Sequence, residues 1–169
     1  GADTIYAGAR LSAKGHRVDA VIFDSSEKNL ELIAREGGEG TRVLDPAHTL
    51  EQLAGYDLTI DGILGTGSSG AVRGSAGEYL GVLRAAQLDG KLGAVLAVDT
   101  PSGVDNNRGT VHEPSLRADR TVTFIGHKLP AGTSHSVHSG DIKLYDLGVP
   151  EALDAHKPAL RVLDREDYR

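Results

Sequence analysis

Residues 57–74 read DLTIDGILGTGSSGAVRG, and this stretch decides the fold class. Its beginning, Asp57 to Ile60, is a short apolar run typical of a buried strand. Asp61 follows, five glycines lie within residues 61–74, and a helical pattern then extends from Ser75 to Gln87. A strand that leads through a glycine-rich loop into a helix is typical of α/β folds with parallel sheets.

The same alternation of strands and helices extends in both directions from this stretch. Short runs rich in Val, Ile and Leu predict strands, and helical spacing or capping residues predict helices between them. The predicted strands are residues 18–23, 41–44, 57–60, 94–98, 120–124 and 141–145, and the predicted helices are residues 3–14, 26–36, 47–53 and 75–87. We expect Asp3 and Ser26 to be N-caps and Gly15 to end the first helix. We therefore predict an α/β fold, a three-layer Rossmann-like sandwich with a mostly parallel central sheet and helices on both faces.

Composition limits the functions that the 169-residue chain can have. It has no cysteine, which excludes disulfides, thiolate metal sites and a cysteine nucleophile and mildly favours the cytoplasm. A formal net charge of −6 without a Lys/Arg block disfavours nucleic-acid binding. No run approaches the roughly 18 apolar residues of a membrane-spanning helix, so we expect a soluble protein with no membrane partner. The chain also has no methionine, and we expect it to be part of a longer protein.

The glycine-rich stretch after Asp61 predicts either an anion-binding loop or a flexible turn. Glycine permits positive φ and has no Cβ, so successive backbone N–H groups can converge on an anion. A helix that begins near Ser75 adds its positive end to the same place. A diphosphate is the ligand that such a loop would hold. The stretch lacks the Gly-Lys-Ser/Thr ending of a Walker loop, which disfavours ordinary ATP or GTP hydrolysis.

A second polar loop follows the predicted strand from Ala94 to Val98 and reads DTPSGVD at residues 99–105. An acid at the carboxyl end of a buried parallel strand lies where such folds bind ligands. Asp99 is therefore a candidate acid/base or hydroxyl acceptor, and a turn cap is the alternative. Ser102 can likewise cap a turn or offer its oxygen to a ligand or ion. If the two strands are neighbours, Asp61 and Asp99 lie in adjacent loops.

Four linked motifs occur along the chain: DGILGTG at residues 61–67, VDTPSGVD at 98–105, ADRTVTF at 118–124 with Lys128, and DLGVP at 146–150. In order and spacing they resemble the NAD(P)H-hydrate epimerases, also called the YjeF N-terminal domain family. The resemblance implies an epimerase domain over residues 1–150, with residues 151–169 as a C-terminal tail or the start of a further domain. It departs at the beginning, where Gly1-Ala2-Asp3 matches only the end of the family's Asn-Asn loop and the family's first strand is absent.

The resemblance also implies an activity and a set of site residues. It implies an isomerase that interconverts the R and S forms of hydrated NADH and NADPH, upstream of a fused or separate S-specific dehydratase. It implies a potassium ion held by Asp61 and Ser102, and an alkali cation does prefer hard oxygen ligands. The residues implied or proposed to bind substrate are Asp3, Gly65, Thr66, Gly67, Ser68, Ser69, Gly70, Ala71 and Asp99. Asp99 is the predicted catalytic acid/base, and Lys128 is a second catalytic candidate, as a proton donor or as a charge that faces the phosphates. We also expect a homo-oligomer and a cytoplasmic location.

Other classes of function are weighed against this hypothesis. A non-catalytic nucleotide-binding or scaffolding module of the same fold is the main alternative. A Rossmann dehydrogenase or methyltransferase is disfavoured, because no convincing pair of glycine loop and ribose-binding acid is found. A hydrolase is disfavoured, because residues 67–70 lack the spacing of a nucleophile elbow. His127, His135 and His138 lack helical i, i+4 spacing, so we expect solvent-exposed loop residues rather than a transition-metal site.

Overall fold

The computed structural model describes residues 1–23, 27–36, 40–65, 67 and 69–149. Across these residues the strands form a four-stranded sheet in the order β3-β4-β7-β8 and two smaller sheets, β1-β2 and β5-β6. The strands are β1 (Val18–Ala20), β2 (Thr41–Val43), β3 (Leu58–Asp61), β4 (Ala94–Val98), β5 (Val104–Asp105), β6 (Thr110–Val111), β7 (Arg120–Phe124) and β8 (Asp141–Tyr145). All pairs are parallel except the antiparallel hairpin β5-β6. The prediction of a mostly parallel sheet is confirmed.

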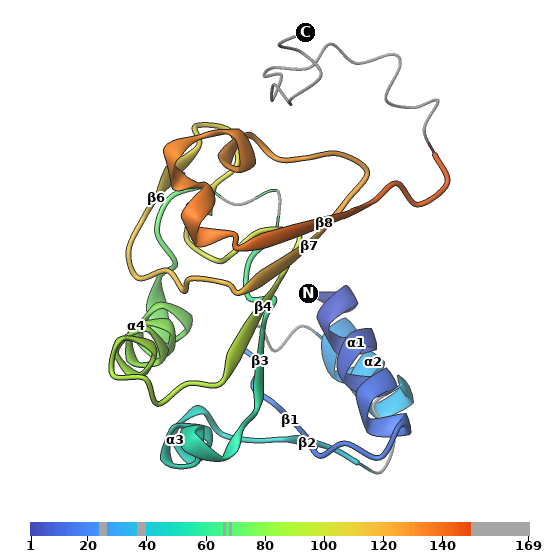
Figure 1. Cartoon of the computed structure of the whole chain (residues 1–169). Helices are drawn as coiled ribbons and strands as arrows, with labels where there is room; N and C mark the ends of the chain where they lie inside the picture. Colours follow the sequence, from blue (N-terminus) through green and yellow to red (C-terminus); the bar gives the residue numbers. More distant parts are fainter. Residues whose placement is uncertain (24–26, 37–39, 66, 68, 150–169) are drawn as a thin grey trace, which may run out of the picture.

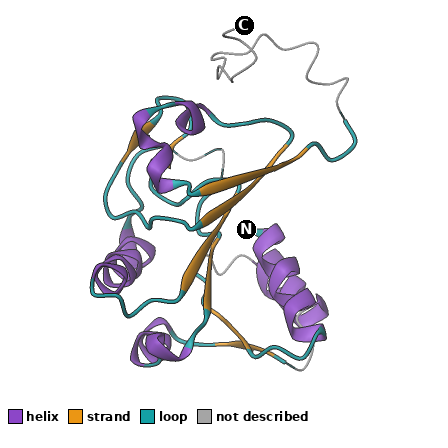
Figure 2. Cartoon of the chain, in the orientation of Figure 1, coloured by secondary structure: helices purple, strands orange, loops and turns teal. Residues whose placement is uncertain are grey.

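Helices cover both faces of the strands (Figures 1 and 2). Helices α1 (Ala2–Ala13) and α2 (Glu27–Glu36) lie together on one side, and α3 (Pro46–Glu51) and α4 (Gly74–Leu88) lie on the other. The short 3-10 helices are η1 (Leu53–Gly55), η2 (Leu129–Gly132) and η3 (Ser134–His138). The predicted layer architecture of helices, sheet and helices is therefore confirmed. None of the described helices combines the length and apolar character that a bilayer span requires.

Helix α1 shows how the local sequence sets the ends of an element. Gly15 has a φ of +89° and its N–H donates to the Ser12 carbonyl at 2.9 Å, so the predicted helix stop is confirmed. The prediction that Asp3 is the N-cap is wrong, because the helix begins at Ala2 with Gly1 as its N-cap. Asp3 instead lies in the first turn, where a carboxylate interacts favourably with the helix dipole. Ser26 lies outside the described residues.

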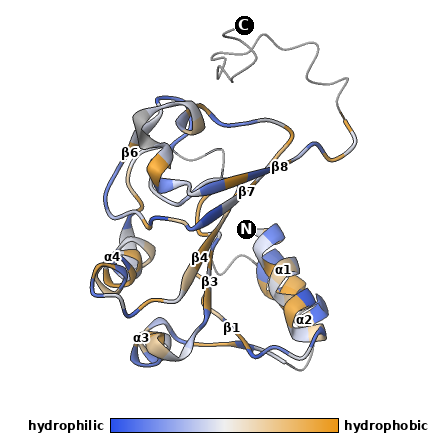
Figure 3. Ribbon diagram, in the orientation of Figure 1, coloured by the Kyte–Doolittle hydropathy of each residue, from blue (hydrophilic) through white to orange (hydrophobic). Residues whose placement is uncertain are grey.

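The hydrophobic core lies between α4 and the sheet. Leu80 and Leu83 of α4 pack with Val95 and Ala97 of β4. Figure 3 shows that β3 and β4 are largely hydrophobic, as packing against α4 requires. Full burial of a Leu or Val side chain contributes about 1.5–3 kcal/mol. Among the described residues, no buried hydrophobic side chain of the core belongs to α1, α2, β1 or β2.

Several predicted boundaries need correction. The strands at residues 94–98, 120–124 and 141–145 are confirmed residue by residue. The strand predicted at residues 18–23 is paired only from Val18 to Ala20, because its ladder with β2 ends there. The helix predicted at residues 47–53 begins at Pro46 and is followed by η1 after Gln52. The hairpin β5-β6 was not predicted, because strands of two residues show no hydrophobic period.

Candidate functional site

The carboxyl ends of β3 and β4 meet at one edge of the sheet, where Asp61 ends β3 and is 3% exposed. The backbone N–H of Ser102 donates to Asp61 Oδ2 at 2.7 Å, and Ser102 Oγ donates to Oδ1 at 2.6 Å. Leu64 N–H in turn donates to Ser102 Oγ at 3.1 Å. Burial raises the pKa of Asp61, and the hydrogen bonds from Ser102 and from Ile63 N–H offset part of that rise. The loop after β4 is thus tied to the end of β3, as we predicted for two acid-bearing loops in neighbouring positions.

Asp99 follows β4 in a backbone conformation that residues with a Cβ rarely adopt. Its φ is +70°, and its N–H donates to the Val122 carbonyl of β7 at 2.6 Å. Its Oδ1 accepts a hydrogen bond from Thr123 Oγ at 3.1 Å and forms an ion pair with Lys128 Nζ at 3.0 Å. Asp99 Oδ2 has no hydrogen-bond partner within the described part of the chain. Strained residues of this kind are concentrated at functional sites, where neighbouring structure fixes them.

Lys128 is turned toward Asp99 and toward its own loop. Besides the ion pair, its Nζ donates to the Phe124 carbonyl at 2.9 Å and to the Gly126 carbonyl at 3.2 Å. An ammonium group has three hydrogens, so these three acceptors use all of them. The side chain is only 22% exposed. This geometry fixes the position of the charge next to Asp99.

The glycine-rich loop lies open at the same edge. Gly65, Gly67 and Ser69 are exposed, and Gly70 and Ala71 are half-buried. A Cβ built on any of the three glycines would meet no described atom within 4 Å outside its chain neighbours. The loop leads into α4, whose N-cap makes no side-chain hydrogen bond to the first turn. Thr66 and Ser68, which we also predicted to bind substrate, lie outside the described residues.

Helix α1 begins beside Asp61. The Gly1 nitrogen donates a hydrogen bond to the Gly62 carbonyl. Gly62 must lack a side chain, because a Cβ there would lie 1.7 Å from Thr4 Oγ1. That hydroxyl is buried and has no hydrogen-bond partner in the described structure. Asp3 is exposed in the same first turn, so it borders this edge.

Sequence reasoning missed Thr123 and misjudged His138. Thr123 is a buried polar residue near the end of β7, beside β4, and its position on the neighbouring strand was the signal that could have found it. His138 was expected to be exposed, but it is 8% exposed, and burial lowers its pKa. Among the described residues, no three His, Asp or Glu side chains form a group that could hold a metal ion.

Comparison with known proteins identifies the family. Residues 1–129 match the family model described as YjeF-related protein N-terminus, which covers more than two thirds of the chain. The chain belongs to the YjeF N-terminal family. This YjeF N-terminal chain is 35% identical over 164 residues to an NAD(P)H-hydrate epimerase of Microbacterium testaceum, covering 95% of the chain and 62% of that relative. It is 31% identical over 153 residues to the bifunctional NAD(P)H-hydrate repair enzyme Nnr of Mycobacterium tuberculosis, covering 88% of the chain and 29% of that protein.

The YjeF N-terminal chain therefore spans less than two thirds of the length of either relative. Its fold is similar to that of the yeast protein ynu0, known from a crystal structure, with a TM-score of 0.65 and 18% sequence identity. The match covers 84% of this chain and 59% of the yeast chain. This likeness confirms the α/β architecture of the YjeF N-terminal chain.

Proposed function

We propose that this YjeF N-terminal domain is an NAD(P)H-hydrate epimerase, an isomerase that interconverts the R and S forms of hydrated NADH and NADPH. The observation that carries the proposal is Asp99, held at a strand end by β7, with one carboxylate oxygen that has no hydrogen-bond partner among the described residues. The names of the Microbacterium and Mycobacterium relatives support the same substrate class. The open glycine-rich loop supplies a place for a diphosphate in the same region.

The reaction needs one group that gives a proton and takes it back. The reacting carbon carries a hydroxyl beside the ring nitrogen, whose lone pair can expel that hydroxyl as the C–O bond breaks. A proton added to the leaving oxygen releases water and leaves a cationic ring. Water then adds to the opposite face and returns a proton, so atoms and charge balance without oxidation or reduction. We assign both proton transfers to Asp99 Oδ2, and general acid–base catalysis of this kind contributes roughly 10²–10⁴-fold.

Lys128 acts in this proposal as a positioning residue. Its three hydrogens are used by the Phe124 and Gly126 carbonyls and by Asp99 Oδ1. It therefore has no hydrogen left for the leaving hydroxyl unless one of these contacts breaks. It fixes the orientation of the Asp99 carboxylate and leaves Oδ2 directed to the substrate. From the sequence we predicted that Lys128 is a proton donor or a charge that faces the phosphates, and here we assign it only the positioning of Asp99.

The loop at residues 65–71 is proposed to hold the diphosphate. Gly70 has a φ of +81°, in the left-handed region. A residue in this region lets successive backbone N–H groups of a loop point to the same side, where they can bind an anion. The N-terminus of α4 follows directly and favours negative charge. Asp3, exposed in the first turn of α1, remains a predicted substrate contact.

The residues around Asp61 fit a potassium ion. The carboxylate of Asp61, the Ser102 hydroxyl and the Gly62 carbonyl are all hard oxygen donors, and alkali cations prefer such ligands. The buried Thr4 hydroxyl next to Gly62, which has no hydrogen-bond partner in the part of the chain that the structure describes, would supply a further oxygen. We propose that Asp61 and Ser102 would hold the ion, which would offset the charge of the substrate diphosphate when bound.

The partner enzyme, the cellular location and the oligomeric state are also proposals. The product would be consumed by a dehydratase, either on a separate chain or on the same one, and the bifunctional name of the Mycobacterium relative supports this pairing. A cytoplasmic location and a homo-oligomeric state stay predictions from the sequence.

Epimer exchange tests the proposed activity. Pure R or S hydrated NADPH is incubated with the chain, and the two forms are separated by chromatography at intervals. We expect exchange with the wild-type chain and a decrease of roughly 10²-fold or more for Asp99→Asn. Lys128→Met should reduce exchange less, while Glu31→Gln on the exposed face of α2 serves as a control. A thermal shift with ADP-ribose, with and without potassium, measures binding separately, so binding without exchange in the wild type would indicate a module without turnover.

A further inference from the structure

Ile125, the first residue after β7, lies at the centre of a strained turn. Its φ is +68°, in the left-handed region, and the Gly126 N–H donates back to the Phe124 carbonyl at 2.7 Å. A hydrogen bond from residue i+2 to residue i around a positive φ is typical of the rare, strained form of the γ-turn. For a β-branched side chain this backbone conformation is an outlier. The fold therefore keeps Ile125 in a conformation that is unfavourable for isoleucine.

The turn itself does not require an isoleucine. It brings the Phe124 and Gly126 carbonyls to the Lys128 ammonium group, at 2.9 Å and 3.2 Å. These contacts help to hold the charge of Lys128 beside Asp99, and they involve only the backbone on either side of Ile125. Glycine adopts a positive φ without steric cost, so it would form the same turn with less strain. The isoleucine is therefore explained by its side chain and not by the turn.

Packing in the core does not account for the Ile125 side chain either. Ile125 is 40% exposed and is not among the described residues that form the core between α4 and the sheet. Two odd-numbered residues of β7, Thr121 and Thr123, are each 2% exposed and share one face of the strand. Thr123 reaches Asp99 on that face. Ile125 is the next odd-numbered residue, so apolar surface is exposed at the edge where Asp99 lies.

Ile125 lies directly beside the ion pair of Asp99 and Lys128. Lys128 Nζ is 2.9 Å from the Phe124 carbonyl oxygen, and three covalent bonds separate that oxygen from the Ile125 Cα. At about 1.2–1.5 Å per bond, the Ile125 Cα is at most about 7 Å from Nζ. Nζ contacts Asp99 Oδ1 at 3.0 Å, and Oδ2 has no hydrogen-bond partner among the described residues. An exposed apolar side chain and an open carboxylate oxygen therefore occur together at the ends of the paired strands β4 and β7.

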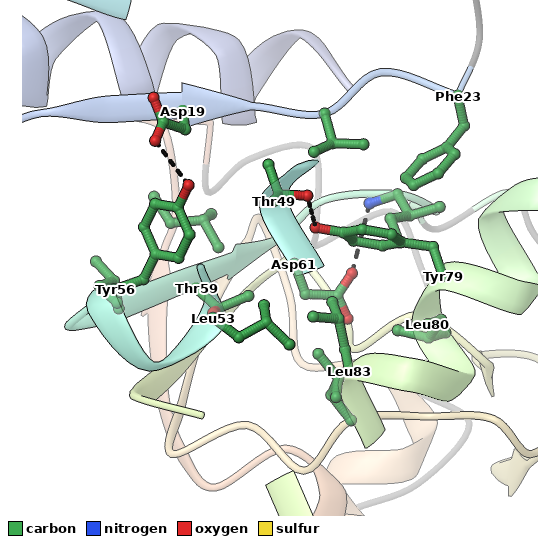
Figure 4. A pocket seen from close by; sticks show the side chains of 15 residues that line it. Asp19, Phe23, Thr49, Leu53, Tyr56, Thr59, Asp61, Tyr79, Leu80 and Leu83 are labelled. Atoms are coloured by element: carbon green, nitrogen blue, oxygen red, sulfur yellow. Dashed lines mark hydrogen bonds between the residues drawn. The ribbon is translucent and has the colours of Figure 1, made fainter. Parts of the chain in front are cut away.

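Two cavities near the site do not include this place. Figure 4 shows the smaller one, about 140 Å³, which lies next to Asp61 and is bordered by Tyr79 and Leu80. Its volume is below the roughly 300–1,000 Å³ of typical ligand pockets. The larger one, about 820 Å³, lies against α1, and neither cavity is lined by Asp99 or Ile125. A group that reacts at Asp99 Oδ2 therefore lies outside both cavities, at the open ends of the strands.

We propose that the Ile125 side chain is the apolar contact for the reacting ring of the substrate, an inference that rests on the proposed epimerase function. The strand order places three kinds of surface in a row, namely the glycine-rich loop after β3, the Asp99 carboxylate after β4 and the Ile125 side chain after β7. A hydrated pyridine nucleotide has a charged diphosphate at one end of this row and a largely apolar ring at the other. Isoleucine has no hydrogen-bonding side-chain group, so it orients the ring without exchanging protons with it.

Leu147 offers a matched control. It also has a positive φ, +58°, and it is 61% exposed. It follows β8, which lies two strands from β4 in the sheet, or roughly 10 Å at about 4.8 Å per strand. Replacing Leu147 with glycine therefore removes similar backbone strain and a similar exposed side chain, but at a greater distance from Asp99.

Binding of two nucleotides that differ only by the ring tests the proposal. NADH and ADP-ribose share the adenosine diphosphate and ribose, and only NADH carries the dihydronicotinamide ring. Burying the 40% of Ile125 that is exposed contributes roughly a three- to eightfold gain in affinity. In calorimetric titrations, Ile125→Gly and Ile125→Ala should each weaken NADH binding by roughly that factor and change ADP-ribose binding by less than about twofold. Leu147→Gly should change both by less than about twofold. In epimer exchange, the Ile125 variants should raise KM by the same factor and change kcat less.

The stability of the two Ile125 variants separates the side chain from the turn. In a regular strand glycine is less stable than alanine. At the positive φ of Ile125 we expect the opposite order, with Ile125→Gly unfolding about 2–4 °C above Ile125→Ala. Both variants should nevertheless lose the same affinity for NADH, because both lack the apolar side chain.

Several results would overturn this inference. Equal losses of NADH and ADP-ribose binding in Ile125→Gly, or no loss of either, would show that the side chain does not contact the ring. A wild-type dimer that both Ile125→Gly and Leu147→Gly convert to monomers in gel filtration would assign these side chains to a second copy of the chain. Epimer exchange by the wild type that the Ile125 variants match would contradict this inference alone. Absence of both exchange and nucleotide binding in the wild type would instead contradict the proposed function, and the inference with it.

Discussion

Replacing Ser102 with alanine tests how the buried carboxylate of Asp61 is held. The change removes an oxygen that donates to Asp61 Oδ1 at 2.6 Å and accepts from Leu64 N–H at 3.1 Å. A hydrogen bond to a charged group contributes about 1.5–3 kcal/mol and one between neutral groups about 0.5–1.5 kcal/mol. Ser102 is 0% exposed, so water does not reach these groups in its place. We therefore expect the free energy of unfolding to fall by about 2–4 kcal/mol and the pKa of Asp61 to rise further.

Urea unfolding followed by circular dichroism measures this loss, because the chain has no tryptophan for fluorescence. Ser75→Ala, at an exposed serine in the first turn of α4, is the control and should change stability by less than about 0.5 kcal/mol. Combining Ser102→Ala with Asp61→Asn should reveal a coupling of at least about 1 kcal/mol between the two positions. A loss below about 0.5 kcal/mol without coupling would refute the reasoning, since the hydroxyl would then not be what holds the carboxylate.

Three further predictions concern pH dependence and close packing. Burial raises the pKa of Asp61, so the folded chain binds more protons than the unfolded chain, and stability falls as pH rises from 3.8 through the folded pKa. Asp61→Asn should remove that fall, as measured by urea titrations across this range. Several groups lower the pKa of Asp105, and the hydrogen bond from the backbone N–H of Arg108 has the largest effect. The stability that the ionised Asp105 carboxylate contributes is therefore present at neutral pH and is lost as pH falls through its folded pKa. Asp105→Asn should therefore reduce the midpoint of thermal unfolding more at pH 7 than at pH 3. Gly93→Ala would place a Cβ 2.4 Å and 2.6 Å from two backbone carbonyl oxygens and should cost about 1–3 kcal/mol, whereas Gly55→Ala, with nothing within 4 Å, should not.

Of the three strands that the sequence predicts residue by residue, β4 and β7 lie inside the four-stranded sheet and β8 lies at its edge. β4 is an apolar run and β7 alternates threonine with other residues, and each has a strand on both sides. The run at residues 18–23 is also mostly apolar, but within the described residues it has a partner only on the β2 side, and pairing ends after Ala20. The composition of a segment determines how much apolar surface it can bury, whereas strand pairing depends on which strands lie next to it. The β1 boundary therefore could not follow from the run alone.

The candidate site was predictable in outline but not in its contacts. Parallel strands end at one edge, so acids after two neighbouring strands were expected to lie in adjacent loops. The link between Asp61 and Ser102 depends on the loop turning at Gly103, whose φ is +93° and where a Cβ would lie 2.6 Å from a backbone carbonyl. Thr123 reaches Asp99 only because β7 pairs with β4 in one register. Strand order and register are long-range properties, and a local sequence pattern does not contain them.

Two features at this edge of the sheet destabilise the fold, namely the buried Asp61 carboxylate and the positive φ of Asp99. A different neighbouring element stabilises each of them. Burying the Asp61 carboxylate is unfavourable, and Ser102 from the loop after β4 compensates for part of it. The positive φ of Asp99 costs about 1–2 kcal/mol for a residue with a Cβ, and β7 fixes it through Val122. Neither arrangement would persist on an isolated strand, because each needs the next strand of the β3-β4-β7 order. The same strand order holds Asp99 Oδ1 with Thr123 and Lys128 and leaves Oδ2 without a hydrogen-bond partner among the described residues. Destabilising features that accumulate at one place and are supported from three strands are better explained by a function at that place than by the stability of the fold.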